Sequence, residues 1–295
     1  MRHIASGLSR ASLLAACTLS GSAAADQIAY EGFDYSPKPN LTGSAGGSGW
    51  AGPWSDVGAI PTAVTAPGLE WPNLLSVGSG AYTPGSTSFE LTTYQRPLAA
   101  YSAPAQTLYL SFLLRPDSGF GTGGGLRFGN WPNAMWVGAP PGYYVYGLMT
   151  SNGLGDFSNV DVVAGQTTLV VVRIVKNTST GKLVYTMWID PEVGEPQPQF
   201  AAATYSIGGN LPTAVTLVND GGLATDEIRL GTTWDDVMPT APACLGDFNG
   251  DGLVTAADLG FLLAFWELPD GDLDGDGITN GADLGLLLGN WGGCP

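Results

Sequence analysis

The chain has 295 residues, and its 26 acidic and 10 basic residues give a formal net charge of −16. This acidic balance excludes nucleic acid as a partner, because neutralising phosphates requires Lys and Arg. The only histidine, His3, lies in an N-terminal leader. The sequence therefore excludes Ser-His-Asp and Cys-His catalysis and imidazole metal sites in the exported chain.

Residues 1–25 have the pattern of a secretory signal peptide. A positively charged start with Arg2, His3 and Arg10 precedes an apolar stretch at residues 11–23, and three Ala residues then form a cleavage site before Asp26. The stretch is too short to span a membrane, and no later segment is long enough. We therefore predict a secreted, extracellular or cell-surface protein without a transmembrane segment.

A lipoprotein signal is the alternative for this leader. Residues 14–17 (LAAC) resemble a bacterial lipoprotein box, which would anchor the chain at Cys17. Ordinary cleavage after residue 25 leaves a longer apolar stretch between the positive charges and the cleavage site, and it is the interpretation that we favour.

Residues 26–238 predict one large antiparallel β-sandwich. Helical periodicity is scarce, and Gly, Pro, Ser and Thr separate short apolar runs. The clearest predicted strands are residues 108–114, 169–175 and 183–189, with a hairpin-like loop at 177–181. Weaker candidates are residues 143–149, 214–218 and 227–230. The Gly/Pro-rich region before Tyr94 gives no clear strands, and residues 239–243 (PTAPA) predict a short stiff linker.

Three segments of this region resemble concanavalin A-like, or laminin G-like, jelly rolls of secreted bacterial proteins. They are residues 30–35 (YEGFDY), 186–191 (TMWIDP) and 226–231 (DEIRLG) before Trp234. The resemblance implies a jelly-roll fold for most of residues 26–238. Lectins, adhesion modules and glycosidases share this architecture, so the fold alone does not decide the function.

The sequence lacks the carboxylate pattern of a glycosidase. Glucanases of this family place Glu-x-Asp-x-x-Glu along one strand, and no such run occurs here. Asp190, Glu192 and Glu195 are separated by Pro and Gly, which indicates a turn after a strand. Asp226 and Glu227 are adjacent, so in a regular strand they point to opposite faces. We expect no catalysis; the alternative is a divergent glycoside hydrolase acting on O-glycosyl bonds in polysaccharide catabolism.

Carbohydrate binding does not require a pair of catalytic carboxylates. Aromatic side chains whose faces stack on sugar rings can provide it. Candidate aromatic residues cluster between Ser118 and Gly147; they are Trp131, Trp136, Tyr143, Tyr144 and Tyr146. The alternative is that these side chains fill the core or support its loops. We assign Trp188, within a predicted strand, to the core.

The C-terminal segment contains the same pattern twice. Residues 246–266 align without a gap on residues 271–291, and 12 of 21 positions are identical. Each copy has oxygen-bearing side chains at loop positions 1, 3, 5, 9 and 12 and Gly at position 6, which is the spacing of a Ca²⁺-binding loop. In the first loop the candidate ligands are Asp247, Asn249, Asp251, Thr255 and Asp258, with the backbone carbonyl of Leu253 at position 7. In the second loop they are Asp272, Asp274, Asp276, Asn280 and Asp283, with the backbone carbonyl of Ile278 at position 7.

A pair of solvated acidic turns is the alternative. Two matches in register, each before an apolar helix pattern, favour two Ca²⁺ sites. Residues 244–295 also contain nine acidic residues and no Lys or Arg. We expect Ca²⁺ to relieve this repulsion and to complete the fold of the module.

Helix-spaced apolar stripes follow both loops. The stripes are Leu259, Leu262, Leu263 and Trp266, and Leu284, Leu287, Leu288 and Trp291. We expect them to pack on each other as a pseudo-twofold core. Off the stripes lie Phe261, Phe265 and Leu286, which form a candidate partner surface.

Two cysteines, Cys244 and Cys294, bracket the repeat. They are the only cysteines left once Cys17 is removed with the leader. An even pair in an exported chain predicts a disulfide, and two free thiols are the alternative.

Residues 244–295 resemble the type I dockerin family. The duplicated loop and helix, with Asp at position 12, carry the resemblance. It implies a small all-α, non-catalytic calcium module with two EF-hand-type loops, which docks a secreted protein onto a cohesin. Positions 10 and 11, where family members typically have a hydroxyl pair for cohesin recognition, are Ala256-Ala257 and Gly281-Ala282 here. The expected partner is therefore a cohesin-like or another extracellular protein.

Together these patterns predict an exported, non-catalytic protein of two modules for extracellular assembly. A lectin-like sandwich would offer a surface for polysaccharide, and the calcium module would dock it to another protein. A structural cell-surface protein is a third interpretation beside the hydrolase.

Overall fold

The computed structural model describes residues 27–56, 61–74, 76, 78–83, 92–103, 106–117, 120, 123–129, 133–219, 221–240, 245–249, 252–273 and 277–293. Several sequence predictions lie outside these ranges: the leader with Cys17, the aromatic Trp131, the cysteines Cys244 and Cys294, and the loop residues Asp251, Asp274 and Asp276. Among the described residues, no helix has both the length and the apolar character needed to cross a membrane.

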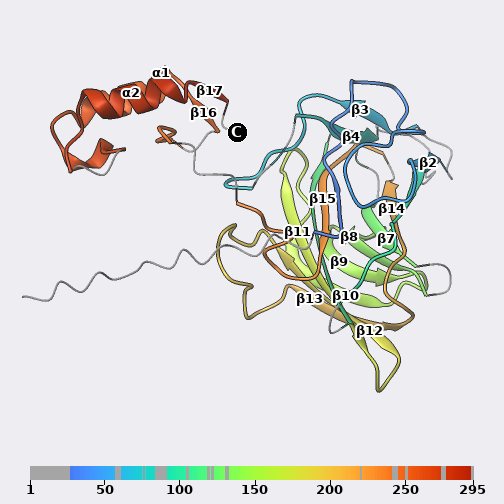
Figure 1. The fold of residues 1–295 in the computed structure, drawn as a ribbon. Helices are drawn as coiled ribbons and strands as arrows, with labels where there is room; N and C mark the ends of the chain where they lie inside the picture. Colours follow the sequence, from blue (N-terminus) through green and yellow to red (C-terminus); the bar gives the residue numbers. More distant parts are fainter. Residues whose placement is uncertain are drawn as a thin grey trace, which may run out of the picture.

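The larger sheet of the described structure has eight strands, all antiparallel to their neighbours (Figure 1). They are β1 (Ala29–Glu31), β3 (Ala63–Thr65), β4 (Gly80–Thr83), β6 (Thr107–Pro116), β11 (Thr168–Asn177), β12 (Lys182–Ile189), β13 (Ala203–Gly208) and β15 (Leu223–Gly231). The order is β13-β12-β11-β6-β15-β4-β3, and β1 also pairs with β15. The predicted strands at 108–114, 169–175, 183–189 and 227–230 are thus confirmed, as is the hairpin that joins β11 to β12.

The other sheet contains seven described strands. They are β2 (Ser55–Asp56), β5 (Thr92–Pro97), β7 (Gly124–Phe128), β8 (Met135–Ala139), β9 (Val145–Thr150), β10 (Gly155–Asp161) and β14 (Ala214–Asn219). Their order is β10-β9-β8-β7-β14-β5-β2, again antiparallel throughout. The weaker strand predictions at 143–149 and 214–218 correspond to β9 and β14.

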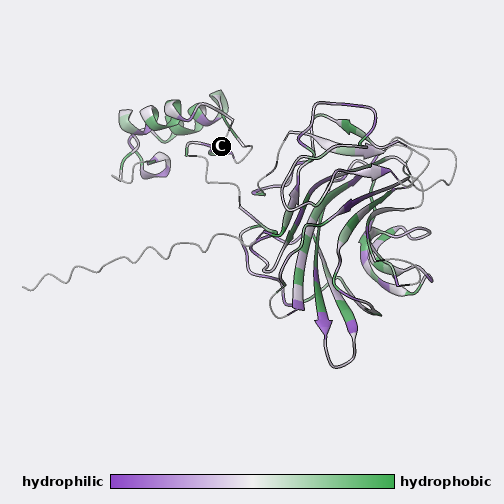
Figure 2. Ribbon diagram, turned by 45° about the vertical axis from the view of Figure 1, so that its right-hand side comes forward, coloured by the Kyte–Doolittle hydropathy of each residue, from purple (hydrophilic) through white to green (hydrophobic). Residues whose placement is uncertain are grey.

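The chain passes repeatedly from one sheet to the other, as in a jelly roll. Strands β4 to β7 alternate between the sheets, and so do β13 to β15. The inner faces supply a shared core, to which β11 contributes Val170, Val172 and Ile174, all fully buried. Hydrophobic and hydrophilic residues alternate along many strands in Figure 2. The predicted antiparallel, jelly-roll-like sandwich is therefore the fold of this region.

A second apolar cluster fills the outer face of the larger sheet. Leu169 and Val171 of β11 point to this face, where they meet Trp188 and Trp234. The two indole rings are edge to face at 5.5 Å, and their N–H groups donate to the backbone carbonyls of Pro198 and Glu195, each at 3.1 Å. Trp188 is buried as predicted. The segment that follows β12 thereby covers this face of the sheet.

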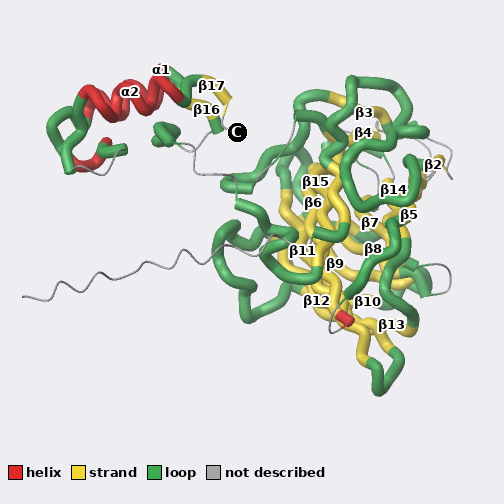
Figure 3. Tube along the Cα trace, in the orientation of Figure 1, coloured by secondary structure: helices red, strands yellow, loops and turns green. Residues whose placement is uncertain are grey.

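The C-terminal module is built from short elements. They are β16 (Leu253–Val254), α1 (Ala256–Ala264), the 3₁₀ helix η2 (Pro269–Gly271), α2 (Gly281–Gly289) and β17 (Gly292–Gly293) (Figure 3). A shift of 25 residues superimposes the bounds of α1 on those of α2. Among the described residues of this module, the fully buried apolar ones are Val254, Leu262 and Leu287. A core of this size leaves the module dependent on other interactions.

Candidate functional site

The first acidic loop closes on the carboxylate of Asp258, its twelfth residue. Asp258 is fully buried. Its Oδ1 accepts hydrogen bonds from the backbone N–H groups of Phe248 (2.9 Å) and Asn249 (3.3 Å), and its Oδ2 accepts from the backbone N–H (2.8 Å) and the hydroxyl (3.2 Å) of Thr255. Thr255 is the N-cap of α1, so Asp258 completes a capping box. Burial raises the pKa of Asp258, but its hydrogen bonds outweigh burial and leave the pKa below its usual range.

Asp247, at position 1, ties the same loop together from the other end. Its Oδ2 accepts a hydrogen bond from the backbone N–H of Gly252 at 2.9 Å. Gly252 has a φ of +81°, a conformation that glycine adopts at little cost. Position 6 of this loop therefore has a backbone conformation that favours glycine.

The second loop repeats this geometry 25 residues later. Asp283 is fully buried and accepts hydrogen bonds from the backbone N–H groups of Leu273 and Asn280, each at 2.7 Å. Asn280 is the N-cap of α2 and shares a capping box with Asp283. Asp272 accepts from the backbone N–H of Gly277 at 2.6 Å, and Gly277 has a φ of +94°. Three hydrogen bonds thus recur in both loops: those from the N–H groups at positions 2 and 9 to the Asp at position 12, and that from position 6 to the Asp at position 1.

The donor set of these loops fits a hard cation, because every predicted ligand is an oxygen atom. The side chains of Leu253 and Ile278 are exposed, which suits residues whose predicted contribution is a backbone carbonyl. Within the described ranges, no three acidic, histidine or cysteine side chains gather into a metal-binding group. The described part of each loop includes only two of its predicted carboxylate ligands, since Asp251, Asp274 and Asp276 lie outside it.

Each loop is paired with the segment that follows the other helix. Strand β16 of the first loop pairs with β17, which follows α2. In the second loop, the backbone N–H of Thr279 donates to the carbonyl of Leu268 (2.8 Å), and the N–H of Glu267 donates to the carbonyl of Thr279 (2.9 Å). The 25-residue shift converts one pairing into the other, so the two loops are paired in a pseudo-twofold arrangement.

The expectation that both helical stripes form the core is only half right. Leu262 and Leu287 are fully buried, and Leu259 and Leu284 pack against them. The remaining stripe residues are exposed: Leu263, Trp266, Leu288 and Trp291. Each helix has only nine residues, and the small core of the described module packs against only part of each stripe. The result is an apolar surface that the sequence pattern assigned to the interior.

The predicted partner surface is less uniform than expected. Phe261 is 47% exposed, whereas Phe265 and Leu286 are half-buried. Phe261 stacks between Phe248 and Phe265, with ring centroids 6.0 and 5.7 Å away. These rings therefore partly cover one another, and the four exposed stripe residues, Leu263, Trp266, Leu288 and Trp291, offer more accessible apolar surface. We call these four residues the exposed stripe.

In the sandwich, two of the candidate sugar-binding aromatics are buried. Tyr146 faces the core, and its hydroxyl makes a 3.0 Å hydrogen bond with the hydroxyl of Thr168. Trp136 is 7% exposed, and its indole N–H donates to the carbonyl of Gly124 at 3.2 Å. The alternative role of filling the fold applies to both. Tyr146 in particular has no accessible ring face for a sugar.

The other two candidates lie at the surface, in the turn between β8 and β9. Tyr143 is 39% exposed and stacks on Phe157 of β10, with ring centroids 4.0 Å apart and planes inclined by 20°. Tyr144 is 82% exposed. The described structure therefore leaves one stacked ring pair, Tyr143 and Phe157, and the separate exposed ring of Tyr144 near the β9–β10 edge of the smaller sheet. We call these three side chains the aromatic platform.

Three of the candidate acid residues of the sandwich make hydrogen bonds within the fold. Asp190 caps the start of β11 by accepting the backbone N–H of Leu169 at 2.8 Å, in the turn predicted after β12. Asp226 accepts the N–H of Leu69 at 2.7 Å, and Glu227 accepts the hydroxyl of Tyr30 at 3.0 Å. Burial, with Glu227 nearby, raises the pKa of Asp226 to about 9.

A β-bulge was missed from the sequence at this point. The register of β15 against β6 shifts between Asp226 and Arg229, and Glu227 has a φ of +53°. A regular alternation of faces therefore does not hold here. Both carboxylates are nevertheless fully buried, so neither is placed to flank a glycosidic bond.

Comparison with known proteins gives structural neighbours alone. No family model matches the chain, and no curated protein matches it. Domain 4 of AbnA, a GH43 extracellular arabinanase from Geobacillus stearothermophilus in complex with arabinotriose, is 15% identical, with a TM-score of 0.43 over 72% of this chain and 97% of that one. An endo-1,3-β-glucanase from Streptomyces sioyaensis is 11% identical, with a TM-score of 0.38 over 69% of this chain and 95% of that one.

A legume lectin-like domain from Entamoeba histolytica is also similar. It is 11% identical, with a TM-score of 0.30 over 57% of this chain and 86% of that one. The neighbours thus include both enzymes and lectin-like domains, and similarity at this level carries no argument about activity. What the chain shares with them is an antiparallel β-sandwich.

Proposed function

We propose that this protein is an exported, non-catalytic binding protein whose C-terminal module holds two Ca²⁺ ions and docks to an extracellular protein partner. The observation that carries the proposal is the duplicated loop closure. In both loops the buried Asp at position 12 joins a helix N-terminus to the loop backbone, and the Asp at position 1 binds the N–H of the Gly at position 6.

The residues of the loops would hold the ions through oxygen atoms. Asp247, Asn249, Asp251, Thr255 and Asp258 would supply the first site with the carbonyl of Leu253, and Asp272, Asp274, Asp276, Asn280 and Asp283 the second with that of Ile278. Bound Ca²⁺ supplies positive charge to a module that has nine acidic and no basic residues. The capping boxes hold the two position-12 carboxylates ready at the helix ends.

Calorimetry of the mature full-length chain, stripped of metal, tests the calcium sites. We expect two bound Ca²⁺ per chain, and one in either Asp258→Asn or Asp283→Asn. Asp270→Asn is the matched control, because it removes a carboxylate of the same module from a position outside both loops and should leave two sites. Equal binding by the control and by both ligand variants would refute the assignment.

The exposed stripe supports the docking role. Leu263 on α1 and Trp266 just after it are repeated by Leu288 on α2 and Trp291 just after it, and these four residues are 39–52% exposed. Apolar patches that remain exposed on a small module often mark a partner surface. The partner would be a cohesin-like or another extracellular protein.

Carbohydrate binding by the sandwich is a second candidate function. The aromatic platform favours it: Tyr144 is strongly exposed, and Tyr143 is held by stacking on Phe157. Exposed aromatic rings suit the apolar faces of sugars. Affinity electrophoresis in soluble polysaccharides tests it, and we expect Tyr144→Ala to abolish retardation. Phe200→Ala, which removes another strongly exposed ring, is the control. A hydrolysis assay on the same polysaccharides distinguishes this function from that of a divergent hydrolase, and an absence of retardation would favour a structural surface protein.

A further inference from the structure

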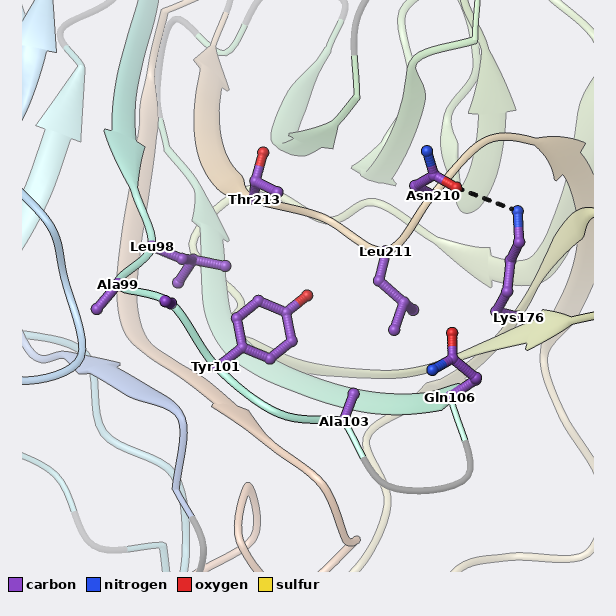
Figure 4. A pocket seen from close by; sticks show the side chains of 10 residues that line it. Leu98, Ala99, Tyr101, Ala103, Gln106, Lys176, Asn210, Leu211 and Thr213 are labelled. Carbon is purple, nitrogen blue, oxygen red and sulfur yellow. Dashed lines mark hydrogen bonds between the residues drawn. The ribbon is translucent and has the colours of Figure 1, made fainter.

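A pocket lies between two connections, each of which leads from one sheet to the other at one end of the sandwich. One connection joins β5 to β6, and the other joins β13 to β14. The pocket has a volume of about 430 Å³ and is lined by ten residues (Figure 4). This volume is within the range of about 300–1,000 Å³ that is typical of small-molecule sites. No motif in the sequence indicated it.

Most of the wall is apolar. Leu98, Tyr101 and Leu211 project into the pocket from the two connections, with Ala99, Ala100 and Ala103 beside them. The hydroxyl of Tyr101 donates to the carbonyl of Pro212 at 2.6 Å, so this bond joins the two connections and fixes the ring. The ring therefore adds an apolar surface of defined orientation.

One end of the pocket carries a positive charge. The ammonium group of Lys176, near the end of β11, donates hydrogen bonds to the carbonyls of Gly181 (2.9 Å) and Gly209 and to the Oδ1 atom of Asn210 (3.4 Å). All three acceptors are uncharged. The ion pairs found within the described residues do not include Lys176, and the described residues that line the pocket include no Asp or Glu.

The polar groups near this charge can donate to an anion. Gln106 and Asn210 lie on the same side of the pocket as Lys176, and their amide groups can each act as a donor, whereas Thr213 completes the lining on the opposite side. The bond from Lys176 to Asn210 is long, so it is the bond most easily exchanged for a stronger acceptor. A carboxylate is such an acceptor, because charge-assisted hydrogen bonds are about twice as strong as neutral ones.

We propose that this pocket binds a small organic carboxylate with an apolar body. The carboxylate pairs with Lys176 in place of the Asn210 Oδ1 atom, and the Asn210 amide rotates to donate to it. The apolar body lies against Tyr101 and Leu211. This site is separate from the calcium loops and from the aromatic platform, so it stands or falls independently of the proposed function.

The test uses the mature full-length chain and two probes, benzoate and hexanoate, with benzamide as the uncharged counterpart of benzoate. Calorimetry and amide chemical-shift mapping measure the binding. We expect shifts centred on Gln106, Lys176 and Asn210, and benzamide to bind at least tenfold more weakly than benzoate. Equal binding of benzoate and benzamide, shifts centred elsewhere, or no binding of either acid would overturn the proposal.

Three variants locate the charge. Lys176→Met removes the ammonium group and should weaken benzoate binding at least tenfold. Asn210→Asp supplies a carboxylate from the protein itself, which should pair with Lys176 and exclude benzoate while leaving the melting temperature unchanged or higher. Lys182→Met removes the same charge from β12, outside the pocket lining, and should bind benzoate like the parent chain. Loss of binding in Lys182→Met, or full binding in Asn210→Asp, would contradict the proposed contact.

Discussion

Replacing Arg96 with Met should strongly destabilise the sandwich, because it leaves a buried carboxylate without its counter-charge. Arg96 on β5 and Glu31 on β1 form an ion pair, and their side chains are only 2% and 1% exposed. Glu31 also accepts hydrogen bonds from the indole N–H of Trp54, the hydroxyl of Tyr35 and the backbone N–H of Phe33, each at 2.8 Å. The pair thereby joins strands of the two sheets.

The size of the expected loss of stability follows from the contacts of Arg96 that the substitution removes. Arg96 also donates to the carbonyls of Gly52 (2.9 Å) and Gly46 (2.8 Å), and its guanidinium lies 4.8 Å from the ring centre of Trp50. Breaking a buried pair by removing one partner costs about 3–5 kcal/mol. Two lost carbonyl bonds add to this. We expect Arg96→Met to lower the free energy of unfolding by at least about 4 kcal/mol, a large part of the roughly 5–15 kcal/mol of an ordinary domain.

Urea denaturation at pH 7 and at pH 4.5 provides the assay, with Arg115→Met as the control for an ion pair at the surface. Burial already raises the pKa of Glu31, and losing Arg96 would raise it further. The variant can protonate Glu31 at low pH, so the cost of the substitution should be smaller at pH 4.5. A loss below about 1 kcal/mol at pH 7, or a loss that does not depend on pH, would show that the pair does not hold the sheets together.

Three further predictions concern separate features. Burial raises the pKa of Asp226 to about 9. Its contribution to the free energy of unfolding is therefore full below pH 4 and is lost as the pH rises to about 9, with a slope of up to about 1.4 kcal/mol per pH unit. Asp226→Asn should remove this slope in chemical denaturation, and an unchanged slope would assign it to other groups. The second loop has four predicted carboxylate ligands and the first has three, so the second should bind Ca²⁺ more tightly. If calorimetry shows that Asp251→Ala removes the tighter Ca²⁺-binding event and Asp276→Ala the weaker one, this ranking is wrong and loop rigidity controls affinity. Cys244 and Cys294 should form a disulfide and appear as one linked fragment in non-reducing peptide mapping. The disulfide would close a loop and stabilise the module by about 4 kcal/mol. Two alkylatable thiols would refute the pairing.

The strands of the sandwich were predictable where their apolar residues are continuous. In β6 and β11 most side chains are buried on both faces, because the second apolar cluster covers the outer face of the larger sheet. The short strands β1 to β4 were not predictable. They have two to four residues each, and their place depends on partners distant in sequence, as in the pairing of β1 with β15.

The two acidic loops were predictable because their geometry is local: the repeated spacing places a glycine at position 6, and both glycines have a positive φ. The capping boxes at the start of α1 and α2 are also local, but they were not predicted from the sequence. The exposure of Trp266 and Trp291 was not predictable, since periodicity shows which residues share a face but not whether another element covers it. Thr279 is a related case: its buried hydroxyl donates to the carbonyl of Leu268 at 2.6 Å and accepts from the N–H of Gly271 at 3.0 Å, a contact that the pattern does not reveal.

Hydrogen exchange of the mature full-length chain, with Ca²⁺ and with a chelator, tests the central claim most directly. Both loops and both helices belong to a module with three fully buried apolar residues. If Ca²⁺ completes its fold, the backbone amides of α1 and α2 and of Gly252 and Gly277 should be protected with Ca²⁺ and exchange rapidly with the chelator. The strands of the sandwich should exchange equally in both conditions. Identical protection of residues 245–293 with and without Ca²⁺ would contradict the account.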